Sequence, residues 1–258
     1  MPGRSHLPQS AAFPDNARLG IAEGKTRGVV DIAFIIDCTG SMGPCIEALK
    51  ANVSSFVDFL ANGAEGEAPP VSNWRARIIG FRDWEFDPVP LEMHPFVSDV
   101  ESLRAQLTGL VAEGGVDEPE CLLDALYACA VCGQTNRGDL PDPGRWRHRS
   151  DATRVAIVFT DASFKQTLFL EQARGGGLDD VMNVLITERI VLSIFAPGME
   201  CYDRLSDLPN SEYDPIPVPQ DMTLQDALAA FTQNRENFEK ALKQLAATIS
   251  RSAATEVV

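Results

Sequence analysis

Oxygen-bearing side chains follow a largely apolar run at alternate positions near the start of the chain. Asp37, Thr39 and Ser41 come directly after residues 29–36, a run rich in β-branched side chains. A short run of this kind, followed by glycine and proline, is typical of a buried parallel strand. Open α/β sheets bind ligands in the crevice beyond the carboxyl ends of their strands, so these three side chains can converge there. Their oxygens suit one hard cation.

Two later segments carry acidic residues that we expect at the same edge of the sheet. Asp161 follows a second apolar run at residues 154–160, and the acidic turn at residues 114–120 contains Asp117 and Glu120. The three histidines are isolated and no cysteine pattern accompanies the acids, so a zinc or copper site is not expected. An all-oxygen ligand set that retains water suits Mg²⁺, with Mn²⁺ and Ca²⁺ as the alternatives.

At these residues the chain resembles the von Willebrand factor A family, whose metal-ion-dependent adhesion site combines Asp-x-Ser-x-Ser, a loop threonine and an aspartate after the fourth strand. The resemblance covers roughly residues 28–252. Thr39 stands in place of the first serine, and the Thr-Gly-Ser-Met form is similar to the intracellular and bacterial branches. The resemblance implies direct coordination by Thr39 and Ser41, and binding by Asp37 and Asp161 directly or through water. It also implies metal-dependent protein binding, in which a partner's acid often completes the coordination.

One segment departs from that pattern, because the loop that usually supplies threonine reads Val116-Asp117-Glu118-Pro119-Glu120 here. Valine cannot bind a metal, and Asp117 is the natural substitute. Three negative charges around one ion would bind it more tightly but attract an incoming carboxylate less. The alternative is that Asp117 or Glu118 caps a helix beginning near Pro119. For the other ligands the alternative is strand-end capping and turn hydrogen bonding.

Four residues are assigned to a partner-binding rim around this site. Trp84 and Phe86 follow a strand and border the metal edge, where they form either a docking surface or packing against the sheet. Lys165 lies in the glycine-containing loop after Asp161, which is either a partner-sensing loop or a plain connector. Glu120 is placed on the rim rather than among the ligands.

Charge narrows the class of partner. Lys and Arg total 22 against 37 Asp and Glu, a net charge of −15, which disfavours nucleic acid and anionic lipid. The one basic and aromatic stretch, residues 145–149, precedes a strand and belongs on the edge opposite the metal. We expect it to be a solvated loop or a secondary protein contact, with a phosphate backbone as the alternative ligand.

Alternation of strands and helices predicts the fold class. We expect an α/β, Rossmann-like, doubly wound and mostly parallel six-stranded sheet with one antiparallel edge strand and helices on both faces. Residues 28–258 would form this domain and residues 1–27 a tail. No apolar stretch approaches the ~20 residues that span a bilayer, so a soluble, cytoplasmic protein with reduced thiols is expected. The predicted strands lie at residues 29–37, 75–81, 89–93, 154–160 and 190–195, with a last, short strand within residues 215–219. The predicted helices lie at residues 44–62, 98–108, 119–131 and 178–187 and near the end of the chain. Ser98 and Glu101 match a capping box at the start of the second helix.

Two classes of function remain open from sequence. The first is a non-catalytic, magnesium-dependent module that recruits a partner protein or scaffolds a complex, with an acidic side chain of the partner at the metal. The second is a magnesium-dependent, phosphatase-like hydrolase. Such hydrolases need an aspartate two positions after the nucleophile, where this chain has Thr39. No Walker loop, dinucleotide motif or Ser-His-Asp elbow appears either, which favours the module. The oligomeric state is left open.

Overall fold

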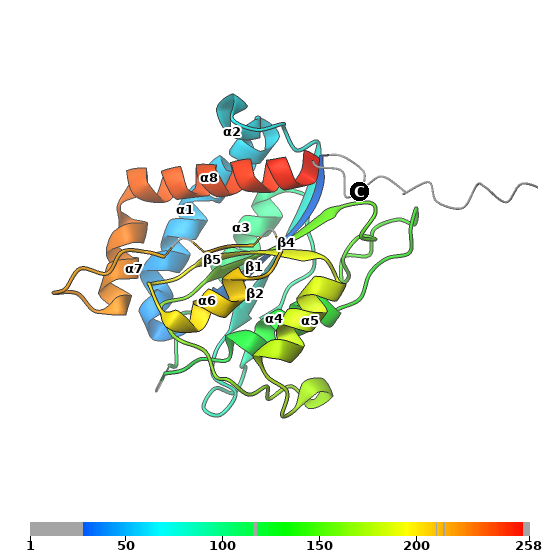
Figure 1. Ribbon diagram of the computed structural model, residues 1–258. Helices are drawn as coiled ribbons and strands as arrows, with labels where there is room; N and C mark the ends of the chain where they lie inside the picture. The colour runs from blue at the N-terminus through cyan, green and yellow to red at the C-terminus, as the bar shows by residue number, and fades with distance from the viewer. Residues whose placement is uncertain (1–27, 116–117, 210, 214, 255–258) are drawn as a thin grey trace, which may run out of the picture.

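A six-stranded sheet forms the centre of the protein (Figure 1). The computed structural model describes residues 28–115, 118–209, 211–213 and 215–254, so the tail expected at residues 1–27 lies outside the described part. Strand order across the sheet is β3-β2-β1-β4-β5-β6; β3 runs antiparallel to β2 and all other pairs are parallel. The strands are β1 (Val29–Asp37), β2 (Asn73–Phe81), β3 (Leu91–Met93), β4 (Thr153–Phe159), β5 (Ile190–Phe195) and β6 (Glu212–Tyr213).

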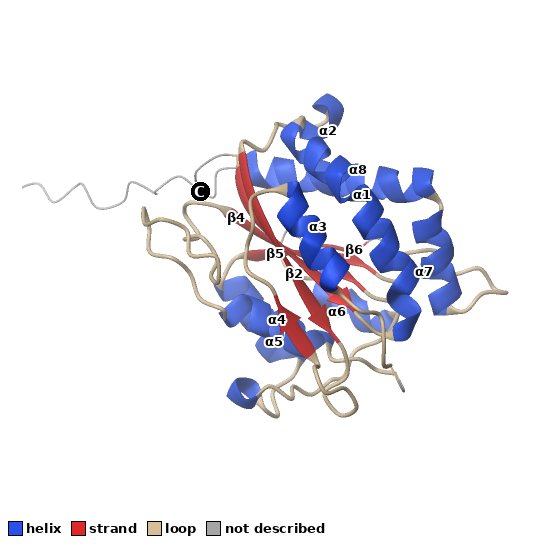
Figure 2. Cartoon of the chain, turned by 180° about the vertical axis from the view of Figure 1, so that it is seen from behind, coloured by secondary structure: helices blue, strands red, loops and turns tan. Residues whose placement is uncertain are grey.

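Helices cover both faces of this sheet, as the view from behind shows (Figure 2). One face packs against α1, α3, α7 and α8, and the other against α4, α5 and α6. The helices are α1 (Gly43–Ala61), α2 (Gly63–Gly66), α3 (Val100–Gly109), α4 (Leu122–Val131), α5 (Leu178–Thr187), α6 (Asp203–Ser206), α7 (Leu224–Gln233) and α8 (Arg235–Ala254), with short 3₁₀ turns at Gly40–Met42, Glu171–Ala173 and Glu200–Tyr202. None of the described helices is both long and apolar enough to cross a membrane.

Burial on both faces explains why β1 is a nearly continuous apolar run. Ile32 and Phe34 point into the core under α1 and α8, whereas Ala33 and Ile35 point into the core under α4 and α5. A strand with two buried faces has no polar face to alternate with, and this is the pattern of parallel sheets. The predicted fold class is confirmed.

The winding of the chain creates a crevice between β1 and β4. From β1 the chain moves outward to β2 and β3, then returns to place β4 on the other side of β1 and continues to β5 and β6. Ligands of open α/β sheets bind at such a reversal, beyond the carboxyl ends of the two strands. Asp37 ends β1, and Asp161 lies two residues past the end of β4.

Most element boundaries differ from the sequence-based prediction by one or two residues, and three larger differences have a local explanation or a new position. The helix predicted from residue 119 begins at Leu122, because Glu120 instead pairs with the chain at Phe164. The helix predicted to be capped by Ser98 is capped by Asp99, whose carboxylate accepts from the backbone amide of Ser102. A last strand is found, but at Glu212–Tyr213 rather than within residues 215–219.

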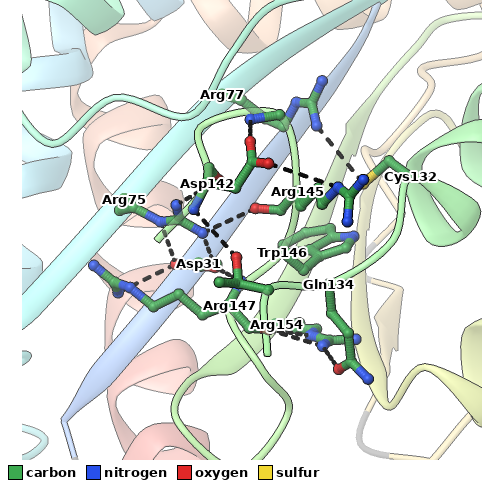
Figure 3. A network of polar contacts seen from close by, with 12 residues as sticks. Asp31, Arg75, Arg77, Cys132, Gln134, Asp142, Arg145, Trp146, Arg147 and Arg154 are labelled. Carbon is green, nitrogen blue, oxygen red and sulfur yellow. Dashed lines mark hydrogen bonds and ion pairs between the residues drawn. The ribbon is translucent and has the colours of Figure 1, made fainter. Parts of the chain in front are cut away.

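A network of ion pairs and hydrogen bonds stabilises the amino-terminal end of the sheet, opposite the edge that carries Asp37 (Figure 3). Asp31 of β1 is fully buried and accepts two hydrogen bonds from Arg75, at 3.0 and 2.6 Å. The backbone amide of Arg147 donates to the same carboxylate at 2.7 Å, and its guanidinium lies 3.2 Å away. Arg75 also donates to the carbonyls of Asp142 and Arg145, so one carboxylate fastens the loop before β4 to the sheet.

The prediction of a solvated loop at residues 145–149 was wrong for its central residues. Trp146 is fully buried, donates from its indole to the carbonyl of Cys129 at 2.8 Å and packs on Phe96 with ring centroids 4.9 Å apart. Arg147 is buried against Asp31. Arg147 supplies a counter-charge to the buried acid on β1, whereas Arg145 and Arg149 are exposed. The expected position, on the edge opposite Asp37, is confirmed.

Removing the buried acid should destabilise the fold strongly. Asp31→Leu leaves Arg75 and Arg147 buried without their counter-charge, which should lower the free energy of unfolding by about 3–5 kcal/mol. Glu47→Ala, which breaks the exposed pair with Lys50, serves as the control and should cost less than about 1 kcal/mol. Urea denaturation of both variants measures the difference. Equal, small losses would contradict a structural role for the network.

Candidate metal centre

Hydroxyl groups surround the carboxylate that ends β1. One oxygen of Asp37 accepts from the backbone amide of Thr39 at 2.9 Å and from its hydroxyl at 2.7 Å. The other oxygen accepts from the hydroxyl of Thr160 at 2.7 Å. Asp37 is fully buried, and the hydroxyl of Ser41 lies 3.4 Å from that of Thr39. The turn hydrogen bonding expected as the alternative is therefore present, and Thr39 and Ser41 also line the open space beyond the two strands.

A second carboxylate faces this group from the end of β4. Asp161 is 1% exposed and accepts a hydrogen bond from Ser41. Among the described residues, its buried Oδ2 atom has no hydrogen-bond partner. An unpaired oxygen at this depth is costly, and a positively charged partner would offset that cost. The adjacent open space makes a cation a fitting one.

That space is a cavity of about 280 Å³ at the carboxyl ends of β1 and β4. Its walls carry both hydroxyls of the turn after β1, the acid after β4 and two further glutamates. The lining residues are Thr39, Gly40, Ser41, Gly114, Gly115, Glu118, Glu120, Asp161, Ala162 and Gln225.

Two glycines let the acidic loop approach the turn after β1. Gly114 and Gly115 have φ angles of +78° and +74°, a region that side chains disfavour. A Cβ atom on Gly115 would lie 2.8 Å from the Cβ of Thr39, and one on Gly114 would lie 2.1 Å from a carboxylate oxygen of Asp87. The backbone amide of Gly40 donates to the carbonyl of Gly114 at 3.4 Å. Glycine is thus required for this loop to close one wall of the cavity.

Burial and mutual repulsion disturb the acids of the cavity. Burial, followed by the charge of Asp161, raises the pKa of Asp37 to about 6, although hydrogen bonds from Thr39 and Thr160 oppose the shift. Burial also raises the pKa of Asp161, against the hydrogen bond from Ser41. Both aspartates therefore stay protonated to a higher pH than an ordinary aspartate does. A divalent cation beside them would stabilise their ionised forms and lower both pKa values.

Glu120 lies inside the cavity rather than on its rim. It is 2% exposed, and its buried Oε2 atom has no hydrogen-bond partner within the described part of the chain. Burial raises its pKa to about 8, with further contributions from the charges of Asp37, Asp83 and Asp87, against which Lys165 acts. Glu118, by contrast, lines the cavity as an exposed residue.

The other three rim residues form a group beside the cavity. The ammonium of Lys165 lies 2.8 Å from Asp83 and also contacts Glu85. It stands 5.7 Å from the ring centroid of Phe86, which is 53% exposed, and Trp84 is half-buried in the same turn. Burial lowers the pKa of Lys165, but hydrogen bonds to Asp83 and Glu85 raise it by more. The ammonium is therefore charged and already paired with these two acids.

The expected ligand Asp117 lies outside the described residues, and its role as a substitute for threonine stays a prediction. Within the described residues, no three Asp, Glu, His or Cys side chains form a ready-made metal cage. The candidate depends instead on hydroxyls, which are weaker ligands, combined with Asp161 and Glu120. These are oxygen donors only, and they fit a hard cation such as Mg²⁺.

Sequence reasoning missed two residues that build the site and gave no role of its own to a third. Thr160 belongs to the segment around Asp161 that was expected to supply oxygen at this edge, and in the structure its hydroxyl orients Asp37. Gln225 reaches the cavity from α7, an element without a strong signal of its own. Arg82 donates to the carbonyls of Cys38, Val89 and Val111, which joins three segments around the cavity. An arginine directly after a buried strand was the available signal.

Comparison with known proteins gives partial matches. No protein-family model matches the chain. It is 29% identical to human von Willebrand factor A domain-containing protein 7 over 141 residues, which is 55% of this chain and 13% of the human protein. It is 27% identical to alpha-protein kinase vwkA of Dictyostelium discoideum over 179 residues, 62% of this chain and 24% of the kinase. The chain thus spans a quarter or less of the length of these curated relatives.

Among solved structures, the chain is similar to proximal thread matrix protein 1 from the mussel byssus, with a TM-score of 0.49 and 14% identity over 85% of this chain and 47% of that one. The curated matches, together with the six-stranded sheet, support a von Willebrand factor A-like chain.

The raised pKa of Asp37 predicts how stability depends on pH in chelator. The folded protein keeps a proton on Asp37 up to about pH 6, whereas the unfolded chain releases it near 3.8. The free energy of unfolding should therefore fall as pH rises from about 4 to 6, by up to about 3 kcal/mol from this group. Urea denaturation at several pH values measures it.

Asp37→Asn removes that titration. The difference in free energy of unfolding, wild type minus variant, should decrease as pH rises from about 4.5 through the folded pKa of about 6 and then level off. The exposed Asp58→Asn variant controls for the loss of one negative charge. A difference for Asp37→Asn that stays constant with pH would contradict the burial of an unpaired charge at this position.

Proposed function

We propose that this chain is a von Willebrand factor A-type protein-interaction module that binds one divalent cation, Mg²⁺, at the carboxyl edge of its sheet. One observation carries the proposal. At the reversal between β1 and β4, two hydroxyls and two buried carboxylates with unpartnered oxygens line a single cavity. Unpartnered buried oxygens at a ligand-binding crevice are what an all-oxygen cation site leaves when the cation is removed.

The described residues divide into direct and orienting groups. Thr39 and Ser41 offer hydroxyl ligands from one turn, and Asp161 offers the oxygen that has no other partner. Asp37 has both oxygens engaged by hydroxyl and amide donors, so it orients Thr39 and contributes charge rather than a free ligand. Asp117 is retained as a further ligand on sequence grounds. Mn²⁺ and Ca²⁺ satisfy the same donors.

Binding of the cation would neutralise these buried acids and hold together the segments that surround the cavity. The turn after β1, the loop at Gly114 and the segment after β4 then present one ordered surface to a protein partner. The net charge of −15 makes nucleic acid and anionic membranes poor partners. One relative is a kinase and others carry further sequence beyond the matched part, which supports a module that recruits or scaffolds.

We also propose that the module is not catalytic. A phosphatase-like hydrolase needs an accessible carboxylate nucleophile, whereas Asp37 is fully buried with both oxygens hydrogen bonded. The acid that such an enzyme requires two positions later is Thr39 here. All six cysteines are free thiols, which suits a reducing compartment such as the cytoplasm.

Direct titration with Mg²⁺ tests the cation site. Isothermal calorimetry should show one site in the wild type, and Ser41→Ala should weaken it by about 10-fold to 100-fold because one oxygen ligand and the partner of Asp161 are lost. Ser98→Ala, an exposed serine away from the cavity, is the matched control and should bind as the wild type does. Absence of binding by the wild type, or equal binding by Ser41→Ala, would contradict the proposal.

The interaction role makes a separate prediction. Tagged protein incubated with cell lysate in Mg²⁺ should retain partner proteins that are lost in chelator. Ser41→Ala should lose the same proteins, and Ser98→Ala should keep them, as measured by quantitative mass spectrometry. If the same proteins are retained in chelator and by Ser41→Ala, partner binding does not depend on the cation, and the proposed interaction role is contradicted.

A further inference from the structure

Glu120 is a carboxylate that no described donor satisfies. It is 2% exposed and its Oε2 atom has no hydrogen-bond partner, yet it lines the same cavity as Thr39, Ser41 and Asp161. Burial of an ionised carboxylate without a partner is unfavourable, so such groups pair with a cation or take up a proton. A glutamate whose only role was packing would have a donor beside it.

The backbone holds Glu120 in place on both sides. Its amide donates to the carbonyl of Ser163 at 2.9 Å, and its carbonyl accepts from the amide of Lys165 at 2.9 Å. These residues lie two and four positions past Asp161, so the bridge fixes Glu120 beside the segment that carries the second buried acid. Capping does not explain the side chain, because α4 begins after Cys121 and has no side-chain cap.

No protein cation is left for Glu120 among the described residues. The nearby ammonium of Lys165 pairs with Asp83 and Glu85 instead. The cavity is therefore short of positive charge at the position where Glu120 enters it.

We propose that Glu120 is an internal ligand of the cation and occupies the coordination position that a partner's acid would otherwise take. This proposal rests on the proposed function, because it needs a cation in the cavity. Together with Thr39, Ser41 and Asp161, Glu120 would bring the oxygen ligands from the described residues to four, and water would supply the remaining oxygens that Mg²⁺ prefers.

Charge then sets the chemistry of partner recognition. Asp37, Asp161 and Glu120 bring three negative charges to a divalent ion, which leaves the site with a net negative charge. An incoming carboxylate is repelled at close range. The partner is thus bound by the surface that the cation orders around the cavity, and an acidic side chain on the partner is not required.

Mn²⁺ serves as the probe, because the relaxation of water protons reports how many water molecules the bound ion carries. Glu120→Ala should add one water to bound Mn²⁺ and weaken its affinity by about 10-fold or more. Acetate should then restore affinity and remove that water by filling the vacated position. The wild type should not respond to acetate. Glu113→Ala, an exposed glutamate of the same loop outside the cavity lining, is the charge-matched control and should behave as the wild type does.

The outcomes distinguish this proposal from the one on which it rests. If the wild type binds Mn²⁺ and Glu120→Ala binds it with the same affinity and the same number of water molecules, Glu120 is not a ligand. The proposed cation site would still stand. No binding by the wild type overturns both. If Glu120→Ala does not fold, the isosteric Glu120→Gln decides: a loss of Mn²⁺ affinity with unchanged thermal unfolding in chelator supports the proposal, and unchanged affinity refutes it.

Discussion

Uncompensated negative charge, buried where β1 and β4 diverge, is the constraint on which the rest of the structure depends. Asp37 and Asp161 are almost completely removed from water, and Glu120 joins them from the acidic loop. Hydroxyls of Thr39 and Thr160 donate hydrogen bonds that offset part of this charge for Asp37, yet the pKa values of all three acids stay raised. A cation in the cavity would supply the compensation that the described side chains do not.

Each end of β1 carries a buried aspartate, and the two aspartates differ in what compensates their charge. Asp31 and Asp37 are both fully buried and six positions apart on one strand. Asp31 is paired inside the protein with Arg75 and Arg147, so its end of the sheet is closed and structural. Within the described residues, Asp37 accepts hydrogen bonds from hydroxyls and an amide but has no positively charged partner, so its charge is left for a partner from outside. This contrast separates an acid that stabilises the fold from one that builds a binding site.

Sequence periodicity predicted the sheet, the edge strand and most helices, because burial on one or two faces leaves a direct pattern in the residues. It also placed Asp37, Thr39, Ser41 and Asp161 near one edge, since parallel strands end together. It did not predict that Glu120 enters the cavity, because that position depends on a backbone bridge to a loop more than 40 residues away. Contacts of this range, such as those of Arg82 and Gln225, have no local signature.

The central claim is that the acids and hydroxyls at the end of β1 and β4 hold one divalent cation. Anomalous diffraction from crystals grown with Mn²⁺ tests it most directly, because the signal locates the ion without assumptions about its ligands. We expect a single strong peak in the cavity, within bonding distance of the hydroxyls of Thr39 and Ser41 and the carboxylate of Asp161. A cavity without a peak, or a peak only elsewhere on this acidic surface, would contradict it.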